Sequence, residues 1–412
     1  MNMLEQLYQI SRIYLQANNF PYHRSSFQGA NFLSHRLSIL AGPRGVGKTT
    51  LIIQKLLNAV DNHFLSPKIL YVPSDHLLIT NTSLYEIAEQ FVQYGGQWIA
   101  FDEIHKYKNW SQELKSIYET FPNLNLFVSG SSLIELHKGS HDLTRRSIVY
   151  HLDGLSFREY LGLRYDLQFE KVVLDDLLQQ HETLSYEIIQ SLAQSMLKIL
   201  PLFKDYLTYG YYPYFLELKD PETYHLTLEQ NIIATIETDI PAVYPTLTGQ
   251  SLRKIKQILT FLSTNVPFKP NYKQLQTAAD ITDLRTLKTY LKYLEDAHLI
   301  RQVGAAGSKF QAIEHAEKLY LHNPNQYYAL SNTPNIGTIR ELFFLCSVNQ
   351  KNKLTIPKTG DFLVNKTILF EIGGRKKDYS QIKTHPAAYL ACDDLEMGIG
   401  HRIPLWLLGF LN

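Results

Sequence analysis

Eight consecutive residues, from Gly42 to Thr49, have the types and spacing of a phosphate-binding loop, G-x-x-x-x-G-K-[ST]. Glycines let the backbone point several N–H groups at phosphate oxygens, beside the partially positive N-terminus of a helix. Lys48 would reach the β- and γ-phosphates and Thr49 would offer a hydroxyl to Mg²⁺, whereas Thr50 caps or packs the helix. The apolar run before the loop and the apolar helix after it favour this interpretation over a chance match in a glycine turn. The expected nucleotide-binding residues are Gly42, Pro43, Arg44, Gly45, Val46, Gly47, Lys48, Thr49 and Thr50.

A second stretch supplies the acids that such a loop needs. Residues 98–103, WIAFDE, read as a buried parallel strand that ends in two carboxylates, Asp102 and Glu103. In phosphoryl-transfer sites a strand of this kind brings its first acid to Mg²⁺ and its second acid to the attacking water. The alternative is a strand that ends in an acidic surface turn. Together with the upstream loop, the pattern predicts that Asp102 holds Mg²⁺ and that Glu103 is the catalytic carboxylate.

Two further polar positions follow in the same part of the chain. The strand LNLFVSG, residues 124–130, leads to Ser131, which would either sense phosphate or cap the next helix. Arg145 and Arg146 stand before the next strand, where one of them would complete a γ-phosphate site as an arginine finger, in cis or in trans. Their alternative is a solvated pair. We take Ser131 and Arg145 as catalytic candidates.

The elements that must position these residues alternate between strands and helices. A helix is expected near residues 3–14, and strands and helices then alternate to about residue 151. This order predicts an α/β domain with a parallel sheet that binds its ligand at the carboxyl ends of the strands. Residues 155–248 have helical patterns and are expected to form a helical lid or connector.

The next region has the pattern of a winged helix, three helices followed by a hairpin, over residues 249–312. Its third helix carries Arg285, Lys288 and Lys292 at intervals of three and four residues, so they share one face. A recognition helix in a DNA major groove would present basic residues in this way. The alternatives are a solvated outer face and a module that contacts protein.

The last region contains an acid on each of two expected strands, Asp361 and Glu371. Restriction-type nucleases hold Mg²⁺ with two such acids and add a lysine two residues after the second one. Here Gly373 occupies that position, so Lys376 or Lys377 would have to reach back, and the double glycine could equally mark a bend in a structural strand. The closing segments AAYLACDD and IPLWLLGFLN are expected to be strands of the same domain.

Composition sets broad limits on the function. The chain has 412 residues, of which 45% are hydrophobic, and 40 Lys and Arg balance 39 Asp and Glu, so no global positive field indicates nucleic acid. Its two cysteines lack metal-binding spacing and are expected to be free thiols in a reducing compartment. The first residues do not have the pattern of a signal peptide, and no apolar run is long enough to span a membrane. We expect a cytoplasmic protein without a membrane segment.

The motifs GPRGVGKTT, WIAFDEIHKYKNW, LFVSGSS, LSFREYL, YLKYLEDAHLI, KLYLHNPN, RELFF and FEIGGRKK occur together in this order. Their set resembles bacterial and archaeal ATPases of the AAA superfamily that join an AAA core, a winged helix and a C-terminal restriction-endonuclease-like domain of unknown function. The resemblance implies ATP rather than GTP, metal at Asp102, hydrolysis through Glu103, and a degenerate or repurposed nuclease fold around Asp361 and Glu371. Such ATPases often form rings, so a homo-oligomer is one of the expectations. Where the family usually has Gly-Arg, this chain has Arg145-Arg146.

These observations predict four domains and three alternative functions. The domains are a P-loop AAA core at 1–154, a helical lid or connector at 155–248, a winged helix at 249–312 and a nuclease-like α/β domain at 313–412. The first function is a switch driven by ATP and Mg²⁺ and coupled to DNA. The second is an ATP-regulated, metal-dependent DNA nuclease. The third is an ATP-gated signalling or scaffold protein that hydrolyses little and acts on a protein partner.

Overall fold

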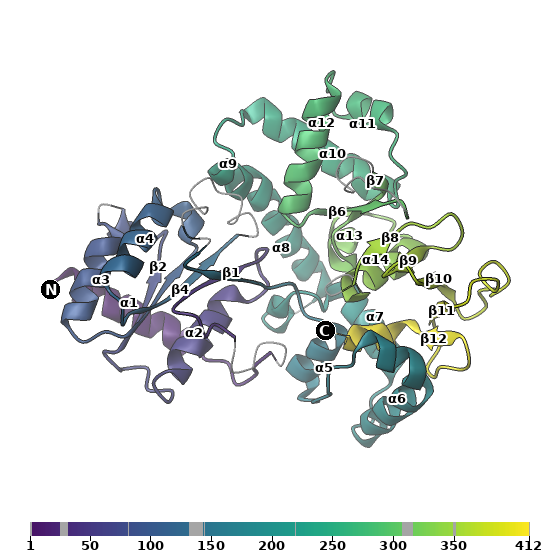
Figure 1. Cartoon of the computed structure of the whole chain (residues 1–412), viewed down its shortest axis with the longest axis horizontal. Coiled ribbons are helices and arrows are strands. Elements are labelled where there is room, and N and C mark those ends of the chain that lie inside the picture. Colours follow the sequence, from purple (N-terminus) through teal and green to yellow (C-terminus); the bar gives the residue numbers. More distant parts are fainter. Residues whose placement is uncertain are drawn as a thin grey trace. The chain divides into compact units, whose positions relative to one another are not determined.

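The computed structural model describes residues 2–24, 32–80, 82–131, 143, 145–218, 220–306, 316–348 and 352–411. The chain divides into two compact units (Figure 1). Unit 1 contains residues 1–153 and 237–246, and unit 2 contains residues 154–236 and 247–412. Within the described residues, no helix combines the length and the apolar character needed to cross a bilayer.

Unit 1 is built on a five-stranded parallel sheet with strand order β2-β3-β4-β1-β5. All five residues of β1 are buried, as expected for a parallel strand covered on both faces. The strands are β1 (Leu37–Ala41), β2 (Ile69–Pro73), β3 (Trp98–Asp102), β4 (Asn125–Gly130) and β5 (Ile148–His151). The expected α/β architecture with a parallel sheet is confirmed.

The helices of unit 1 connect parallel strands, so each connection is expected to be a right-handed crossover. The chain passes from β1 to β2 at the edge of the sheet, and the connections from β2 to β3 and from β3 to β4 run in the opposite direction across the sheet. Helix α2 therefore covers one face of the sheet, and α3 and α4 cover the other face (Figure 1). Ser83 begins α3 with a capping box that includes Glu86. The helices are α1 (Met3–Ala17), α2 (Lys48–Asn58), α3 (Leu84–Gln93) and α4 (Trp110–Thr120), with short 3-10 turns at Leu77–Ile79 and Ile104–Lys106.

The register of the sheet aligns the strand ends that carry polar residues. Ala41 of β1 pairs with Gly130 of β4, and Phe101 of β3 pairs with Val128 of the same strand. The loop after β1, the acids after β3 and the polar end of β4 therefore meet at one edge. Ligands of open α/β sheets bind at this carboxyl edge.

Unit 1 also includes a segment from much later in the chain, residues 237–246. It begins within a π-helical turn, Thr235–Asp239, and continues into the short helix α9 (Ile240–Val243). The side chains of Asp239 and Ile240 are buried. Helical turns of the π type are uncommon and occur often at functional sites.

Unit 2 begins with helices in the region expected to be a helical connector. They are α5 (Phe157–Tyr165), α6 (Leu174–Gln194), α7 (Ile199–Tyr209), the 3-10 turn Pro213–Leu216 and α8 (Pro221–Ala234). The buried Asn325 side chain organises their turns, because its amide nitrogen donates to the carbonyl oxygens of Tyr206 and Leu207. Its amide oxygen accepts from the backbone N–H of Tyr211 and from the hydroxyl of Tyr224.

Three helices and an antiparallel strand pair follow in unit 2. They are α10 (Gly249–Asn265), α11 (Tyr272–Ala278), α12 (Leu284–Asp296), β6 (Ile300–Gly304) and β7 (Ala316–Leu321). The loop between the two strands includes residues 307–315, which lie outside the described part of the chain. The second strand thus begins beyond residue 312, where we expected the winged helix to end.

The remainder of unit 2 contains a mixed five-stranded sheet of order β12-β11-β10-β9-β8. Strands β8, β9 and β10 pair antiparallel, and β10, β11 and β12 pair parallel. Its elements are α13 (Pro324–Leu330), α14 (Ile336–Val348), β8 (Leu354–Thr355), β9 (Phe362–Val364), β10 (Ile368–Gly374), β11 (Ala388–Asp393) and β12 (Arg402–Pro404). The chain then forms a 3-10 helix, Leu405–Phe410, where we expected a strand to continue. A fully buried apolar run does not distinguish a strand from a helix by its periodicity.

Candidate functional site

The loop of Gly42 to Thr49 connects β1 to α2, as the sequence predicts. Gly45 and Gly47 have φ angles of 78° and 93°, in a region that side-chain-bearing residues rarely adopt. A Cβ atom on Gly42 would lie 2.3 Å from the backbone oxygen of Leu152, so only glycine fits there. The backbone geometry therefore matches a loop that turns around phosphate and opens a helix at Lys48.

The two functional side chains of this loop face the acids after β3. Lys48 is buried, and its Nζ donates to the carbonyl oxygens of Gly42 and Pro43 at 3.0 Å each. The same Nζ lies 3.9 Å from Oε1 of Glu103. The hydroxyl of Thr49 donates to Oδ2 of Asp102 at 2.6 Å. The structure thus brings the loop and the acidic strand end into one site.

Asp102 is held by three hydroxyl groups. Besides Thr49, the Tyr71 hydroxyl donates to Oδ2 at 2.5 Å, and the Ser129 hydroxyl donates to Oδ1. Burial raises the pKa of Asp102, and the hydrogen bonds from Thr49 and Tyr71 offset only part of that effect. A buried carboxylate with fixed oxygen neighbours is suited to a metal ion, whose positive charge would favour its ionised form.

Glu103 lies beside a group of cationic and imidazole side chains. Its backbone N–H, at a residue with φ of 54°, donates to Ser129 Oγ and to Asp102 Oδ1, both at 3.1 Å. Its carboxylate lies 3.5 Å from Lys106 Nζ and 3.7 Å from His105 Nε2. Burial alone would raise the pKa of Glu103, but Lys48, His105 and Lys106 hold it below its ordinary value. Glu103 is therefore ionised at neutral pH, as a proton acceptor must be.

Arg44 of the loop is bound by a residue that the sequence did not indicate. Its Nε donates to Oδ2 of Asp239 at 2.8 Å and its Nη2 donates to Oδ1 at 2.5 Å, which is the two-pronged geometry that guanidinium groups form with carboxylates. Burial would raise the pKa of Asp239, yet Arg44 and His105 hold it well below the usual range. Asp239 lies 195 residues from Arg44 in the chain, and no local motif in the sequence indicates such a pair.

Two more side chains support the site from positions that sequence reasoning missed. Tyr71 is a polar group within an otherwise apolar strand, ILYVP, next to the acidic strand, and that position was the available signal. Arg24 donates from Nη1 to the carbonyl oxygens of Val46 and Asp153, at 3.4 and 2.8 Å. It ties the phosphate-binding loop to the residue that ends the main part of unit 1.

The remaining candidates of unit 1 take different positions. Ser131 is buried, and its backbone N–H donates to Nδ1 of His105 at 3.2 Å. Arg145 is exposed in the turn before β5. Arg146 pairs with Glu119 of α4 at 2.5 Å. A phosphate-sensing role for Ser131 and an arginine-finger role for Arg145 stay predictions.

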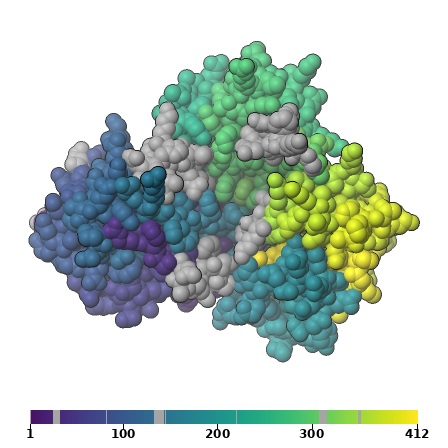
Figure 2. Space-filling model, in the orientation of Figure 1, coloured from purple at the N-terminus to yellow at the C-terminus, as the bar shows by residue number. Residues whose placement is uncertain are grey.

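The basic residues of α12 differ in their surroundings. Part of residues 249–296, green in Figure 2, lies on the visible surface of the molecule. Arg285 is exposed, whereas the Lys288 ammonium lies 5.6 Å from the centre of the Tyr272 ring and Lys292 pairs with Asp296 at 3.1 Å. DNA contact by this helix stays a prediction.

The acids expected in the C-terminal sheet lie near a lysine. Oδ2 of Asp361 accepts the backbone N–H of Ile372 at 2.8 Å, and Oε1 of Glu371 lies 2.6 Å from Nζ of Lys377. A Cβ atom on Gly373 would lie 2.7 Å from Cγ of Lys377, so the missing side chain makes room for the lysine stem. Of the two lysines that we expected could reach back to the second acid, Lys377 contacts Glu371.

Glu341 of α14 is a further acid in this region, to which the sequence alone assigned no role. It accepts hydrogen bonds from the Tyr320 hydroxyl and from Lys318 Nζ, the latter at 3.2 Å. Burial raises the pKa of Glu341, and Lys318 and Tyr320 offset part of that effect. The charge of Asp361 raises it further, which places the two acids in one electrostatic environment.

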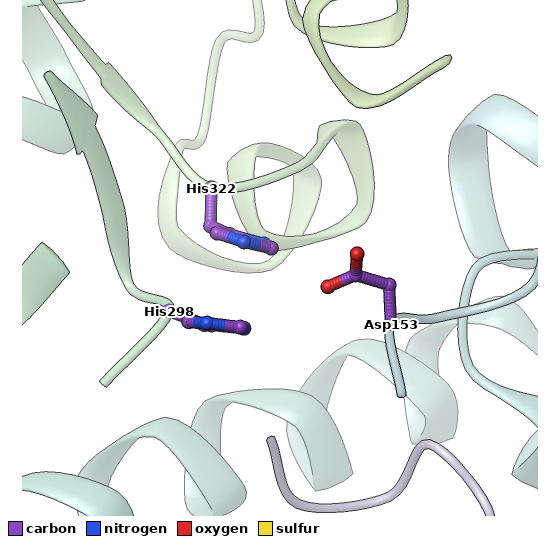
Figure 3. Close-up of side chains that lie close together, drawn as sticks. All are labelled: Asp153, His298 and His322. Atoms are coloured by element: carbon purple, nitrogen blue, oxygen red, sulfur yellow. The ribbon is translucent and has the colours of Figure 1, made fainter. Parts of the chain in front are cut away.

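Unit 2 also contains a pair of stacked histidines. The rings of His298 and His322 face each other in Figure 3, with centres 4.8 Å apart and planes inclined by 10°. Burial lowers the pKa of His322 well below its ordinary value, and Arg301 and His298 lower it further. The His322 ring is therefore neutral at pH 7. Both rings line a pocket together with Glu295 and Arg301.

Two segments of the chain match family models. Residues 34–161, which carry the phosphate-binding loop, Asp102 and Glu103, match the family model described as an AAA domain. This segment is therefore similar to AAA domains. Residues 200–336 match a domain of unknown function, DUF8612. The expected AAA core is thereby confirmed at the level of this domain, and among curated proteins none matches the chain.

Several solved structures have a weak likeness to the chain. The Aeropyrum pernix ORC1 protein, solved in complex with DNA, is 12% identical over 81% of this chain and 92% of its own, with a TM-score of 0.29. DnaA from Aquifex aeolicus, solved with AMPPCP, is 12% identical over 72% of this chain and 89% of its own, with a TM-score of 0.24. A katanin structure is 19% identical over 43% of this chain and 60% of its own, with a TM-score of 0.25. TM-scores this low do not extend the likeness to function.

Proposed function

We propose that this protein binds ATP with Mg²⁺, hydrolyses it, and uses the cycle as a switch. The observation that carries the proposal is the meeting of four groups at one sheet edge. Thr49 and Asp102 oxygens lie 2.6 Å apart, and Lys48 Nζ lies 3.9 Å from the Glu103 carboxylate. Their types and arrangement are those that phosphoryl transfer to water requires.

In this proposal each residue has a defined task. Backbone N–H groups of the loop and Lys48 hold the β- and γ-phosphates, and Glu103, ionised at neutral pH, accepts a proton from the attacking water. The Thr49 hydroxyl and the Asp102 carboxylate fit Mg²⁺, because magnesium prefers hard oxygen ligands. Bound there, the ion would neutralise negative charge that develops on the phosphate oxygens. Ser129 and Tyr71 keep Asp102 in place.

We further propose that the switch acts on DNA through the winged-helix region, with Arg285 as one of its exposed cations. Arg285 is exposed near the start of α12. The test is ATP turnover with and without duplex DNA at two salt concentrations, for the unaltered chain and for Arg285→Ala. DNA-stimulated turnover that falls with added salt and with Arg285→Ala supports DNA coupling, because phosphate contacts release counterions. Turnover that ignores DNA at low salt rejects it and favours an ATP-gated protein partner.

A second candidate function has its own supporting observation, the approach of Lys377 to Glu371 over Gly373. Metal-dependent nucleases of the restriction type need two acids and a lysine around the attacking water. Asp361, Glu371 and Lys377 would fill these roles. The test is cleavage of plasmid DNA with Mg²⁺ by the unaltered chain, Asp361→Asn and Lys377→Met. Cleavage that both changes abolish, with ATP affinity unchanged, supports the nuclease; no cleavage, or cleavage indifferent to both changes, rejects it.

A further inference from the structure

The segment 237–246 gives unit 1 a residue that binds the phosphate-binding loop itself. Asp239 is 2% exposed and holds Arg44, the third residue of the loop, through two hydrogen bonds of 2.8 and 2.5 Å. The hydroxyl of Thr238 accepts a further bond from Arg44 Nη2 at 2.9 Å. Residues on both sides of this segment in the chain belong to unit 2. The backbone therefore leads from each end of this segment directly into unit 2.

His105 connects this ion pair to Glu103. Its Nδ1 accepts the backbone N–H of Ser131 at 3.2 Å, so a neutral ring carries its proton on Nε2. That Nε2 lies 3.7 Å from Oε2 of Glu103 and 3.6 Å from Oδ1 of Asp239. One imidazole N–H thus stands between two carboxylates and can donate fully to only one of them.

We propose that Asp239 is a positioning residue that competes with the γ-phosphate of ATP for Arg44 and thereby reports the nucleotide state to the 237–246 segment. The inference rests on the proposed ATPase function. A guanidinium fork binds a carboxylate or a phosphate equally well in geometry, but it cannot face both with the same N–H groups. When Arg44 turns to phosphate, Asp239 loses its two strongest hydrogen bonds. ATP binding then loosens the hold of the phosphate-binding loop on the 237–246 segment.

ADP offers no γ-phosphate, so it competes less well for Arg44. The ATP and ADP states therefore differ in the length of time that Asp239 holds the loop. This difference gives the cycle a mechanical output within unit 1. The output does not depend on the identity of the partner or on DNA.

The test is a double-mutant cycle on nucleotide affinity. The variants are Asp239→Asn, Arg44→Gln and their combination, with Glu119→Gln as a matched control that removes a different ion pair of unit 1. Affinities for fluorescent ATP and ADP analogues are measured with Mg²⁺ under conditions that prevent turnover. Asp239→Asn should bind the ATP analogue roughly tenfold more tightly than the unaltered chain does, as expected for one charge-assisted pair. Its affinity for the ADP analogue should increase by a smaller factor. In the Arg44→Gln chain the same change should alter ATP affinity by less than about twofold.

A general effect of removing a negative charge would persist without Arg44, so the cycle separates the two explanations. Thr238→Val, which removes only the hydroxyl next to Arg44 Nη2, provides a milder variant and should shift ATP affinity in the same direction. Unchanged or weaker ATP binding by Asp239→Asn and Thr238→Val, or an effect that survives in Arg44→Gln, overturns the inference. Failure of the unaltered chain to bind ATP overturns the proposed function instead. Failure of the inference is measured in the variants, and failure of the proposed function is measured in the unaltered chain.

Discussion

The Tyr71→Phe change tests the account of Asp102 in its clearest form. The Tyr71 hydroxyl donates to Asp102 Oδ2 at 2.5 Å, and both side chains are almost fully buried. Phenylalanine keeps the ring, and with it the packing against Tyr14, whose ring centre lies 5.0 Å away. The change therefore removes only the hydrogen bonds of one hydroxyl, to the Asp102 carboxylate and with Thr49.

The size of the effect follows from the kind of hydrogen bond that is lost. A hydrogen bond to a charged group contributes about 1.5–3 kcal/mol to the free energy of unfolding, and a neutral one about 0.5–1.5 kcal/mol. Four donors, the hydroxyls of Thr49, Tyr71 and Ser129 and the Glu103 backbone N–H, surround the two Asp102 oxygens, which is the pattern of an ionised carboxylate. Tyr71→Phe should therefore reduce the stability of unit 1 by about 1.5–3 kcal/mol in nucleotide-free buffer at neutral pH. Tyr8→Phe is the matched control, because the Tyr8 hydroxyl donates at 2.7 Å to the carbonyl oxygen of Pro67, a neutral acceptor. It should cost about 0.5–1.5 kcal/mol.

Urea unfolding followed by tryptophan fluorescence measures these differences. The chain has three tryptophans, so a Trp406→Phe background leaves Trp98 and Trp110, both in unit 1, as the reporters. In an Asp102→Asn background the acceptor is neutral, and Tyr71→Phe should cost no more than the control. A loss in Tyr71→Phe equal to that in Tyr8→Phe, or an unchanged loss in the Asp102→Asn background, would refute the reasoning.

Three further predictions concern other parts of the two units. Gly42→Ala should destabilise unit 1 by about 1–3 kcal/mol and weaken ATP binding, because the new Cβ would press on the Leu152 carbonyl oxygen; urea unfolding and nucleotide titration measure both effects. The pKa of Asp239 is depressed in the folded chain, so its ionised form stabilises the protein fully above the unfolded pKa of about 3.9, and this stabilisation is lost as the pH falls below that value. The loss of unfolding free energy caused by Asp239→Asn, measured by urea unfolding, should therefore become smaller between pH 7 and pH 3. Gly373→Ala should displace the stem of Lys377, so any Mg²⁺-dependent DNA cleavage should fall as it does in Lys377→Met, whereas cleavage that survives Gly373→Ala would contradict the proposed role of this lysine.

The parts of the site that the sequence predicts are those encoded in contiguous motifs. The loop glycines, Lys48, Thr49 and the acids after β3 are separated by short, characteristic spacings, and the parallel sheet brings them together by its register. The alternation of strands and helices was enough to predict this sheet. Local sequence patterns and strand order were therefore sufficient to predict the fold of unit 1 and the central residues of its site.

The parts that could not be predicted depend on contacts between distant segments. Asp239 meets Arg44 only because residues 237–246 join unit 1, and no periodicity indicates that return. The sequence left open whether Lys376 or Lys377 reaches Glu371, because that depends on how the chain bends after β10. The structure places the stem of Lys377 against Gly373. In residues 405–410 a uniformly apolar run left the choice between strand and helix to tertiary packing, and the structure has a 3-10 helix there.

The most direct test of the central claim separates ATP binding from ATP hydrolysis. Steady-state hydrolysis and equilibrium binding of ATP are measured with Mg²⁺ for the unaltered chain, Glu103→Gln and Lys48→Ala. The account predicts that Glu103→Gln binds ATP as tightly as the unaltered chain but loses turnover by a factor on the order of 10² or more, as expected for removal of a catalytic base, and that Lys48→Ala loses binding. Full turnover in Glu103→Gln, or unchanged binding in Lys48→Ala, would contradict it.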